Sequence, residues 1–347
     1  MHGRAPTGAG AVARYAAFGL EICSDLRLPE LAPMLVTSVR QETITIAASS
    51  HAEWPPLQAS PESTSVLQMA PGDWRLALEG IGWFRVQGGS RISWERWDDS
   101  VSDRDLRTFL VTSCLGALQI QRGALVLNAT TLVRDGKGVM LLGSPVSGKS
   151  TLTWCLLQQG WQLLSSELSV VDDQGLVWPG LQQLKLWHDS AVALGLDWPE
   201  LSLVRRGLKR YSLVQPQVTV ADQAAPLSLI YGLGAREKKA PTTLAAVDDG
   251  MQTNSAVGEV GIFPLGSERA ALLRIRNQAY QPRFYRAMGQ EVNLFLKASS
   301  LVQRGGGYLL KVPAGIRRMQ QALKSVDLLD PEALLESGAN QANEVAS

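Results

Sequence analysis

The stretch that decides the fold is Gly143-Ser-Pro-Val-Ser-Gly148-Lys149-Ser150-Thr151. It matches the spacing G-x-x-x-x-G-K-[ST] without a gap. The apolar run Gly138-Val-Met-Leu-Leu142 precedes it, and the helix-like segment Thr151–Gln159 follows it. A phosphate-binding loop requires this order of strand, loop and helix, because the loop amides and the helix N-terminus then point at one anion.

The residues of this phosphate loop have separate expected roles. Gly143 and Gly148 relieve crowding where the backbone meets a phosphate. Lys149 is expected to neutralise the β- and γ-phosphates, and the Ser150 hydroxyl is expected to bind Mg²⁺. The sequence therefore predicts a site for ATP or GTP formed by Gly143, Ser144, Pro145, Val146, Ser147, Gly148, Lys149, Ser150 and Thr151.

A second expected part of the site is an acidic residue at the end of a neighbouring strand, where it can hold the metal. The segment Trp161–Leu164 has the pattern of a strand, and Ser165-Ser166-Glu167 follows it. Glu167 therefore stands where a metal-binding carboxylate is expected. The later pair Asp172-Asp173 precedes Gln-Gly between two apolar runs, which is ordinary turn chemistry.

Composition excludes several classes of function. The chain has 347 residues, 45% hydrophobic and 19% charged, which fits a globular protein of about two domains. Its net charge of +1 gives no support for a broad nucleic-acid surface. The sequence contains no run of about 18 apolar residues, so no membrane span is predicted. Met1–Ala13 lacks the apolar core of a secretory signal. The three scattered cysteines indicate free thiols, so we expect a cytoplasmic protein.

The periodicity of the sequence divides the chain into four parts. Residues 1–13 are expected to be a flexible arm, and 14–100 a small antiparallel β-rich domain with glycine turns. From Ser102 to Gln121 apolar residues recur at helical spacing, with Ser102 as the N-cap. Residues 101–326 form the predicted phosphate-loop domain, and 327–347 a polar tail. Within that domain, Ala124–Leu127 and Val139–Leu142 bracket a turn at Arg134–Gly138 and predict a hairpin.

Three runs carry a resemblance to a known family: Arg122–Ala129, Gly138–Thr151 and Gln159–Glu167. With them the chain resembles the catalytic domain of the HPr kinase/phosphorylase family. It is most similar to the HPr-kinase-related serine kinases associated with peptide modification, including lasso-peptide kinases. The resemblance covers roughly residues 14–325, and it also includes Tyr15–Leu20, Ser24–Leu31, Trp178–Trp187, Lys209–Tyr211 and Gly307–Pro313.

The resemblance implies both a fold and an activity. The fold is α/β, a mixed-sheet phosphate-loop domain of the HPr-kinase kind with a smaller β-rich N-terminal domain. The activity is ATP- and Mg²⁺-dependent transfer of phosphate to a serine of a peptide or small protein. Relatives can form homo-oligomers, whereas neither nucleic acid nor a membrane is an expected partner.

The chain departs from the family's usual catalytic set at three positions. The family's histidine falls on Asn128, and its Asp-Asp pair falls on Ser166 and Glu167. The first Asp is taken as the base, and Ser166 is a poor base near neutral pH. Glu167 keeps a carboxylate for Mg²⁺, while Asn128 can hydrogen-bond but cannot titrate. Losing a general base typically slows a reaction by about 10²–10⁴-fold.

Two main hypotheses follow. One is a serine kinase with the degenerate catalytic set Asn128, Ser166 and Glu167; the other is a non-catalytic nucleotide-binding module that recognises a peptide. Nucleotide hydrolysis that drives a conformational change is a third.

The basic segment Arg205–Arg210 is either a solvated loop or a docking site, with Lys209 and Arg210 matching the family. The sequence leaves open the acceptor, the choice between ATP and GTP, the oligomeric state and whether catalysis survives.

Overall fold

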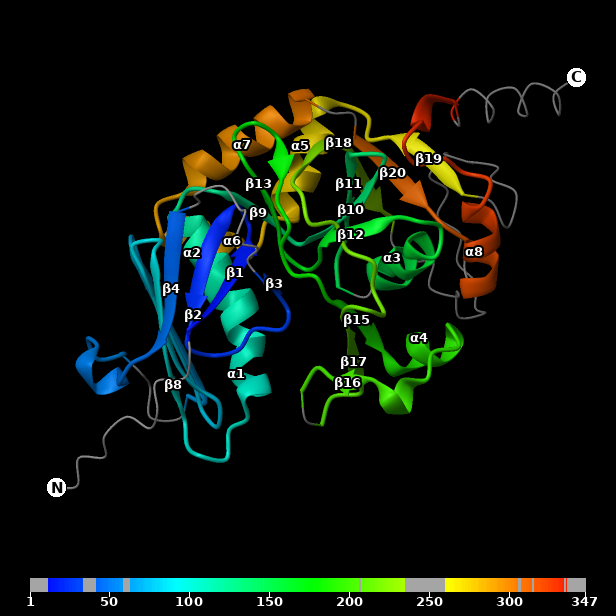
Figure 1. The fold of residues 1–347 in the computed structure, drawn as a ribbon. Coiled ribbons are helices and arrows are strands. Elements are labelled where there is room, and N and C mark those ends of the chain that lie inside the picture. The colour runs from blue at the N-terminus through cyan, green and yellow to red at the C-terminus, as the bar shows by residue number, and fades with distance from the viewer. Residues whose placement is uncertain are drawn as a thin grey trace, which may run out of the picture.

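Figure 1 shows the fold in a computed structural model that describes residues 12–33, 42–58, 63–145, 147–205, 207–234, 260–304, 307–313, 315–333 and 335. Three sheets with surrounding helices make up this part of the chain, so the prediction of a mixed α/β architecture is confirmed. Most of the predicted N-terminal arm and of the polar tail, together with Val146, lie outside these residues. No helix within the described ranges is long and apolar enough to cross a bilayer.

The N-terminal part forms an eight-stranded sheet in the order β3-β1-β2-β4-β8-β7-β6-β5. Its strands are β1 (Ala13–Ala17), β2 (Leu20–Ser24), β3 (Ala32–Pro33), β4 (Glu42–Ala48), β5 (Ser65–Ala70), β6 (Asp73–Leu78), β7 (Gly82–Gln87) and β8 (Arg91–Arg96). The expectation of an antiparallel sheet is wrong at its centre, where β4 runs parallel to both β2 and β8. Short turns impose antiparallel pairing, but β4 is separated from β2 by residues 25–41, a length that allows a parallel return.

One continuous helix links this sheet to the rest of the chain. It consists of α1 (Asp103–Phe109), a π-helical segment (Leu110–Cys114) and α2 (Leu115–Gln121). The Ser102 hydroxyl accepts a hydrogen bond from the Asp105 N–H, which confirms the predicted N-cap. π-Helical segments are rare and are often found at functional sites.

The second sheet has nine strands and contains the predicted phosphate loop. They are β9 (Leu125–Leu127), β10 (Ala129–Arg134), β11 (Lys137–Leu142), β12 (Gln162–Ser165), β13 (Ser169–Val171), β14 (Leu176–Val177), β18 (Ala225–Leu233), β19 (Gly261–Pro264) and β20 (Gly307–Lys311). The predicted hairpin exists, but its first strand is β10 and not the run at Ala124–Leu127. The turn at Asp135 and Gly136 has positive φ at both residues, so it pairs Arg134 with Lys137. The run at Leu125–Leu127 pairs with β13 instead.

The register of β10 determines where the site forms. β10 is antiparallel to both β11 and β12, so β11 and β12 run in the same direction with β10 between them. Their C-terminal ends and the N-terminal end of β10 therefore meet at one edge of the sheet. This edge brings together Asn128, the phosphate loop and Ser166-Glu167. The helix α3 (Lys149–Leu157) starts at the same edge.

A small third sheet lies below α3 in Figure 1, formed by β15 (Leu184–Trp187), β17 (Arg210–Leu213) and β16 (Ser202–Leu203). α4 (His188–Ala193) follows β15 in the chain and contacts β15 and β17. The remaining elements are α5 (Glu268–Asn277), α6 (Pro282–Ala287), α7 (Glu291–Arg304), α8 (Ile316–Leu323) and two 3₁₀ turns, His51–Glu53 and Trp198–Glu200.

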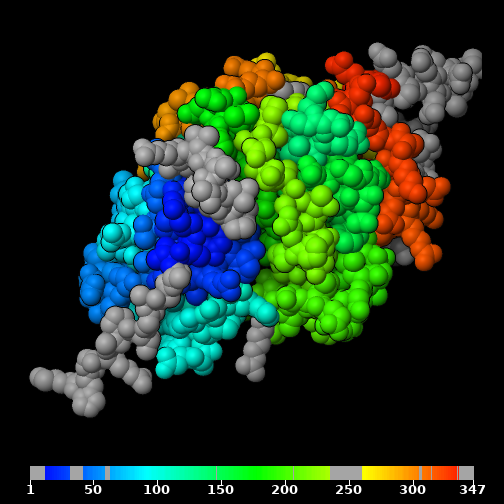
Figure 2. Space-filling view, viewed as in Figure 1, coloured from blue at the N-terminus to red at the C-terminus, as the bar shows by residue number. Residues whose placement is uncertain are grey.

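Apolar contacts cross the predicted domain boundary near residue 100. One buried cluster contains N-terminal sheet residues such as Ile22 and Phe84 together with α2, β9 and α7 residues, and a second lies around α3 and β11. Figure 2 shows the blue N-terminal surface directly against the green middle of the chain. The Phe18 N–H donates to the Pro179 carbonyl at 2.7 Å across this contact. These contacts join the two parts of the chain, and the division into two domains near residue 100 stays a prediction.

Candidate functional site

The phosphate loop connects β11 to α3 in a conformation that depends on two glycines. Gly148 has φ +96°, which L-residues with side chains rarely adopt. A Cβ on Gly143 would lie 2.6 Å from Ser147 Oγ, closer than two such atoms approach. The backbone conformation itself therefore requires Gly148, whereas Gly143 leaves room for the Ser147 side chain.

Lys149 folds back over this loop. Its ammonium donates to the carbonyls of Gly143 and, at 3.1 Å, of Ser144. Burial lowers the pKa of Lys149 to about 8, with Arg210 acting in the same direction and Glu167 opposing it. Lys149 therefore carries a charge that an anion at the loop would stabilise.

The loop opens into a cleft of about 880 Å³. We call it the phosphate cleft. Its walls come from the loop, from the segment after β12, from the third sheet, from the helix that links the N-terminal sheet to the rest of the chain, and from the turn before α6. Among the residues that line the cleft are Thr108, Thr112, Asn128, Gly143, Ser144, Pro145, Ser147, Gly148, Lys149, Ser150, Thr151, Ser166, Glu167, Lys185, Trp187, Asp189, Arg205, Arg210, Tyr280 and Gln281.

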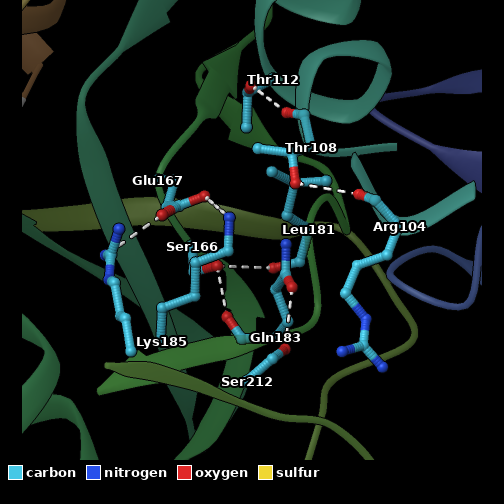
Figure 3. Close-up of polar contacts among 10 residues, drawn as sticks. Arg104, Thr108, Thr112, Ser166, Glu167, Leu181, Gln183, Lys185 and Ser212 are labelled. Carbon is cyan, nitrogen blue, oxygen red and sulfur yellow. Dashed lines mark hydrogen bonds and ion pairs between the residues drawn. The ribbon is translucent and has the colours of Figure 1, made fainter. Parts of the chain in front are cut away.

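Glu167 lies in this cleft between two cations. Its Oε2 accepts from Lys185 Nζ at 2.6 Å (Figure 3). Its Oε1 accepts from Arg210 Nη2 at 3.4 Å. The Lys185 side chain is only 6% exposed, so Glu167 is the counter-charge that allows it to be buried. Both carboxylate oxygens are thus engaged with cations.

Ser166 is also engaged with its surroundings. It is 3% exposed, and its hydroxyl is directed at the carbonyls of Leu181, at 3.1 Å, and of Gln183 (Figure 3). A hydroxyl has one proton, and here two carbonyls share it. Ser166 lines the cleft, but its hydrogen bonds tie the strand end to the neighbouring segment and leave no donor for a reacting group.

Asn128 stands at the start of β10, beside the phosphate loop. Its N–H donates to the Gln278 carbonyl at 2.7 Å, and its amide Nδ2 lies 3.4 Å from the Ala279 carbonyl. These contacts join β10 to the segment after α5. The structure therefore brings Asn128, Ser166 and Glu167 to one cleft, as the sequence suggested.

The basic segment divides into two parts. Arg210 lines the cleft and contacts Glu167, whereas Lys209 is exposed, does not line the cleft and uses its carbonyl to accept from the His188 N–H at 3.1 Å. Lys185 is not among the site residues predicted from the sequence. The feature that points to it is a charged residue between Leu184 and Leu186, because a lysine in an apolar run is rarely buried without a partner.

The residues of the cleft wall that lies across from Glu167 were not predicted from the sequence either. This wall is polar and uncharged. Thr108 and Thr112 come from α1 and the π-helical segment, where their hydroxyls donate to carbonyls one turn earlier (Figure 3). Gln281 has φ 45° and Glu167 has φ 61°, so the cleft contains two of the four non-glycine residues with left-handed φ in the described ranges. Such residues cluster at functional sites.

The residues present fit a phosphate group better than a metal ion. Mg²⁺ in nucleotide sites is commonly bound by one or two carboxylates together with the phosphates. Here each oxygen of Glu167 already accepts from a cation, so a divalent ion on Glu167 would lie beside the charge of Lys185 or Arg210. The other expected ligand is the Ser150 hydroxyl, and Asp189 is the second carboxylate that lines the cleft. With two cations on its oxygens, Glu167 does not fit the Mg²⁺-binding role that the sequence predicts for it.

Comparison with known proteins gives little. No family model matches the chain, and no curated protein matches it. Among solved structures it is similar to the Hpr(Ser) kinase/phosphatase from Coxiella burnetii, with 12% identity and a TM-score of 0.25, over 63% of this chain and 97% of that one. At this identity and TM-score the likeness is distant.

The environment of Ser166 predicts that an aspartate, the family's residue, is not accepted there. Ser166→Asp would place a carboxylate against two carbonyls in a buried position, and we expect a loss of about 2–4 kcal/mol in the free energy of unfolding. Ser166→Ala removes the hydroxyl donor of the Gln183 carbonyl, while the Leu181 carbonyl keeps the Ser166 N–H at 2.9 Å, so we expect a loss of only about 1–2 kcal/mol. Denaturant unfolding of both variants measures the difference. An aspartate variant as stable as the wild type would contradict this account.

Proposed function

We propose that the phosphate cleft binds a nucleoside triphosphate, with ATP as the first candidate, and that this chain is a nucleotide-binding protein of the HPr-kinase-like kind. The observation that carries the proposal is the loop itself: a glycine-dependent turn between a buried strand and a helix N-terminus, with Lys149 lying over it. Such a loop provides backbone N–H groups and a cation for the same phosphates.

The charges around the loop support an anionic ligand. The cleft is lined by four cationic side chains and two acidic ones, a formal charge of +2 (four minus two). They are Lys149, Lys185, Arg205 and Arg210 against Glu167 and Asp189. The chain as a whole carries only +1. The positive charge is therefore concentrated in the cleft, where it would raise the local concentration of phosphate anions.

The uncharged wall of the cleft supports the proposal that a phosphate acceptor binds there. Thr108, Thr112, Tyr280 and Gln281 face the same cleft as the loop and carry hydroxyl and amide groups. A peptide bearing a serine could dock on this wall through backbone hydrogen bonds and bring its hydroxyl to the γ-phosphate. The peptide or small-protein acceptor, and any homo-oligomer, are proposals of the same kind.

Between a working serine kinase and a non-catalytic module, the hydrogen bonding favours the module. Ser166 donates to two carbonyls, and Glu167 is held by Lys185 and Arg210. A serine hydroxyl is a poor base near neutral pH, and the two cations on Glu167 disfavour protonation of its carboxylate, so neither group suits the role of a general base. We therefore propose nucleotide-dependent recognition as the main activity and phosphate transfer as a weak one.

The first test is calorimetric titration with ATP of the wild type and of Lys149→Ala. We expect the variant to bind roughly 10- to 100-fold more weakly, because a hydrogen bond to a charged group contributes about 1.5–3 kcal/mol. Lys137→Ala is the matched control, since it removes an exposed lysine at the other end of β11 and should leave binding unchanged. An unchanged affinity for Lys149→Ala would contradict the proposal.

Binding is also expected to weaken as the pH rises. Burial holds the pKa of Lys149 at about 8 in the free protein, so the ammonium loses its proton as the pH passes that value. Between pH 7.5 and 9 its protonated fraction falls about eightfold, and the affinity should fall by a similar factor. Lys149→Arg keeps its charge and should give a flat profile. A flat profile for the wild type would contradict a lysine of lowered pKa at the phosphates.

Turnover distinguishes the module from the kinase. With labelled ATP and a pool of serine peptides, in Mg²⁺ or Mn²⁺, we expect labelled phosphate to be transferred or released more slowly than about 10⁻² s⁻¹, against about 1–100 s⁻¹ for working kinases. Chromatographic separation of ATP, ADP and phosphopeptide measures it. Transfer at about 1 s⁻¹ to any peptide of the pool would restore the kinase hypothesis.

A further inference from the structure

We infer that the phosphate cleft binds its nucleotide without a divalent metal, and that Glu167 serves to hold two phosphate-binding cations, Lys185 and Arg210. This inference rests on the proposed function and concerns the same cleft. It assigns to Lys185 and Arg210 the neutralising role that a bound Mg²⁺ has in other phosphate-loop sites.

The first observation is the geometry of Glu167. Each of its oxygens accepts from a different cation, Oε2 from Lys185 and Oε1 from Arg210. A divalent ion on either oxygen would lie beside the ammonium of Lys185 or the guanidinium of Arg210 and would be repelled by it. If the metal displaced Lys185, whose side chain is 6% exposed, the lysine would lose its counter-charge, and an unpaired buried charge strongly destabilises a fold.

The second observation is the way Arg210 is held. Its guanidinium lies 5.5 Å from the ring centroid of Trp187, and its Nη2 contacts Glu167. Its Nε is buried and has no partner among the described residues. An arginine held by a ring and a carboxylate, with donors still unused, is prepared to bind a phosphate oxygen.

The third observation is that these cations share one environment with the loop. Both Glu167 and Arg210 influence the charge state of Lys149, and all of them line the same cleft. Lys149, Lys185 and Arg210 therefore approach a bound phosphate chain together. A free divalent cation would enter against this excess of positive charge, whereas a polyphosphate would be attracted.

The experiment is a pair of titrations of the full chain with ATP, one in excess EDTA and one in excess Mg²⁺. We expect the two dissociation constants to agree within about threefold, and inorganic tripolyphosphate in EDTA to compete with ATP. Binding that Mg²⁺ strengthens tenfold or more would overturn the inference and leave the proposed function intact. No binding in either buffer would overturn the proposed function itself.

Variants separate the two roles of Glu167. If it holds cations, Glu167→Gln should bind ATP in EDTA at least as tightly as the wild type, since it makes the cleft more positive. Its melting temperature should fall and should rise more on adding tripolyphosphate than that of the wild type. If Glu167 is a metal ligand, the variant should bind ATP at least tenfold more weakly in Mg²⁺ and unchanged in EDTA, which would refute the inference.

Lys185→Met gives a second test should Glu167→Gln fail to fold. It removes the buried ammonium, keeps a side chain of similar length and leaves Glu167 paired with Arg210. We expect ATP binding in EDTA to weaken about tenfold or more, whereas Lys137→Met should bind as the wild type does. Unchanged binding by Lys185→Met would show that Lys185 does not meet the phosphates and would overturn its assigned role.

Discussion

The pairing of β10 with two neighbours at once is the constraint on which the site depends. Because β10 is antiparallel to β11 and to β12, the phosphate loop, Asn128 and Glu167 come to one edge of the sheet although they are far apart in the chain. Moving β10 by one residue would exchange the side chains on its two buried faces and shift Asn128 relative to the loop and Glu167. The apolar interiors of β10 and β11 hold that register, and the positive-φ turn at Asp135-Gly136 aligns the two strands.

On that scaffold, the chemistry is determined by one carboxylate among cations. Glu167 stabilises a buried lysine and an arginine. The same contacts that allow Lys185 to be buried also disfavour Glu167 as a base. The proposed binding of phosphates and the proposed weakness of phosphate transfer therefore have the same physical origin.

Much of the local structure could be predicted from the sequence. The glycines and Lys149 of the loop, the helix N-cap at Ser102 and the strand before Ser166 all have short-range signals, because each depends on backbone sterics or on hydrogen bonds between near neighbours. The prediction failed where pairing is long-range. The central parallel strands of the N-terminal sheet and the partner of Leu125–Leu127 depend on which segments meet in space, and local periodicity carries no record of that.

The sequence by itself determined the order of apolar strand, glycine-containing loop and helix around Lys149, and it singled out Asn128, Ser166 and Glu167 as candidate site residues. Only the tertiary structure decided what those residues do. Ser166 is occupied by the carbonyls of Leu181 and Gln183, and Glu167 by Lys185 and Arg210, which come from a separate small sheet. The physical reason is that the state of a carboxylate or hydroxyl depends on the charges and donors within a few ångströms. Folding brings those groups together from distant parts of the chain.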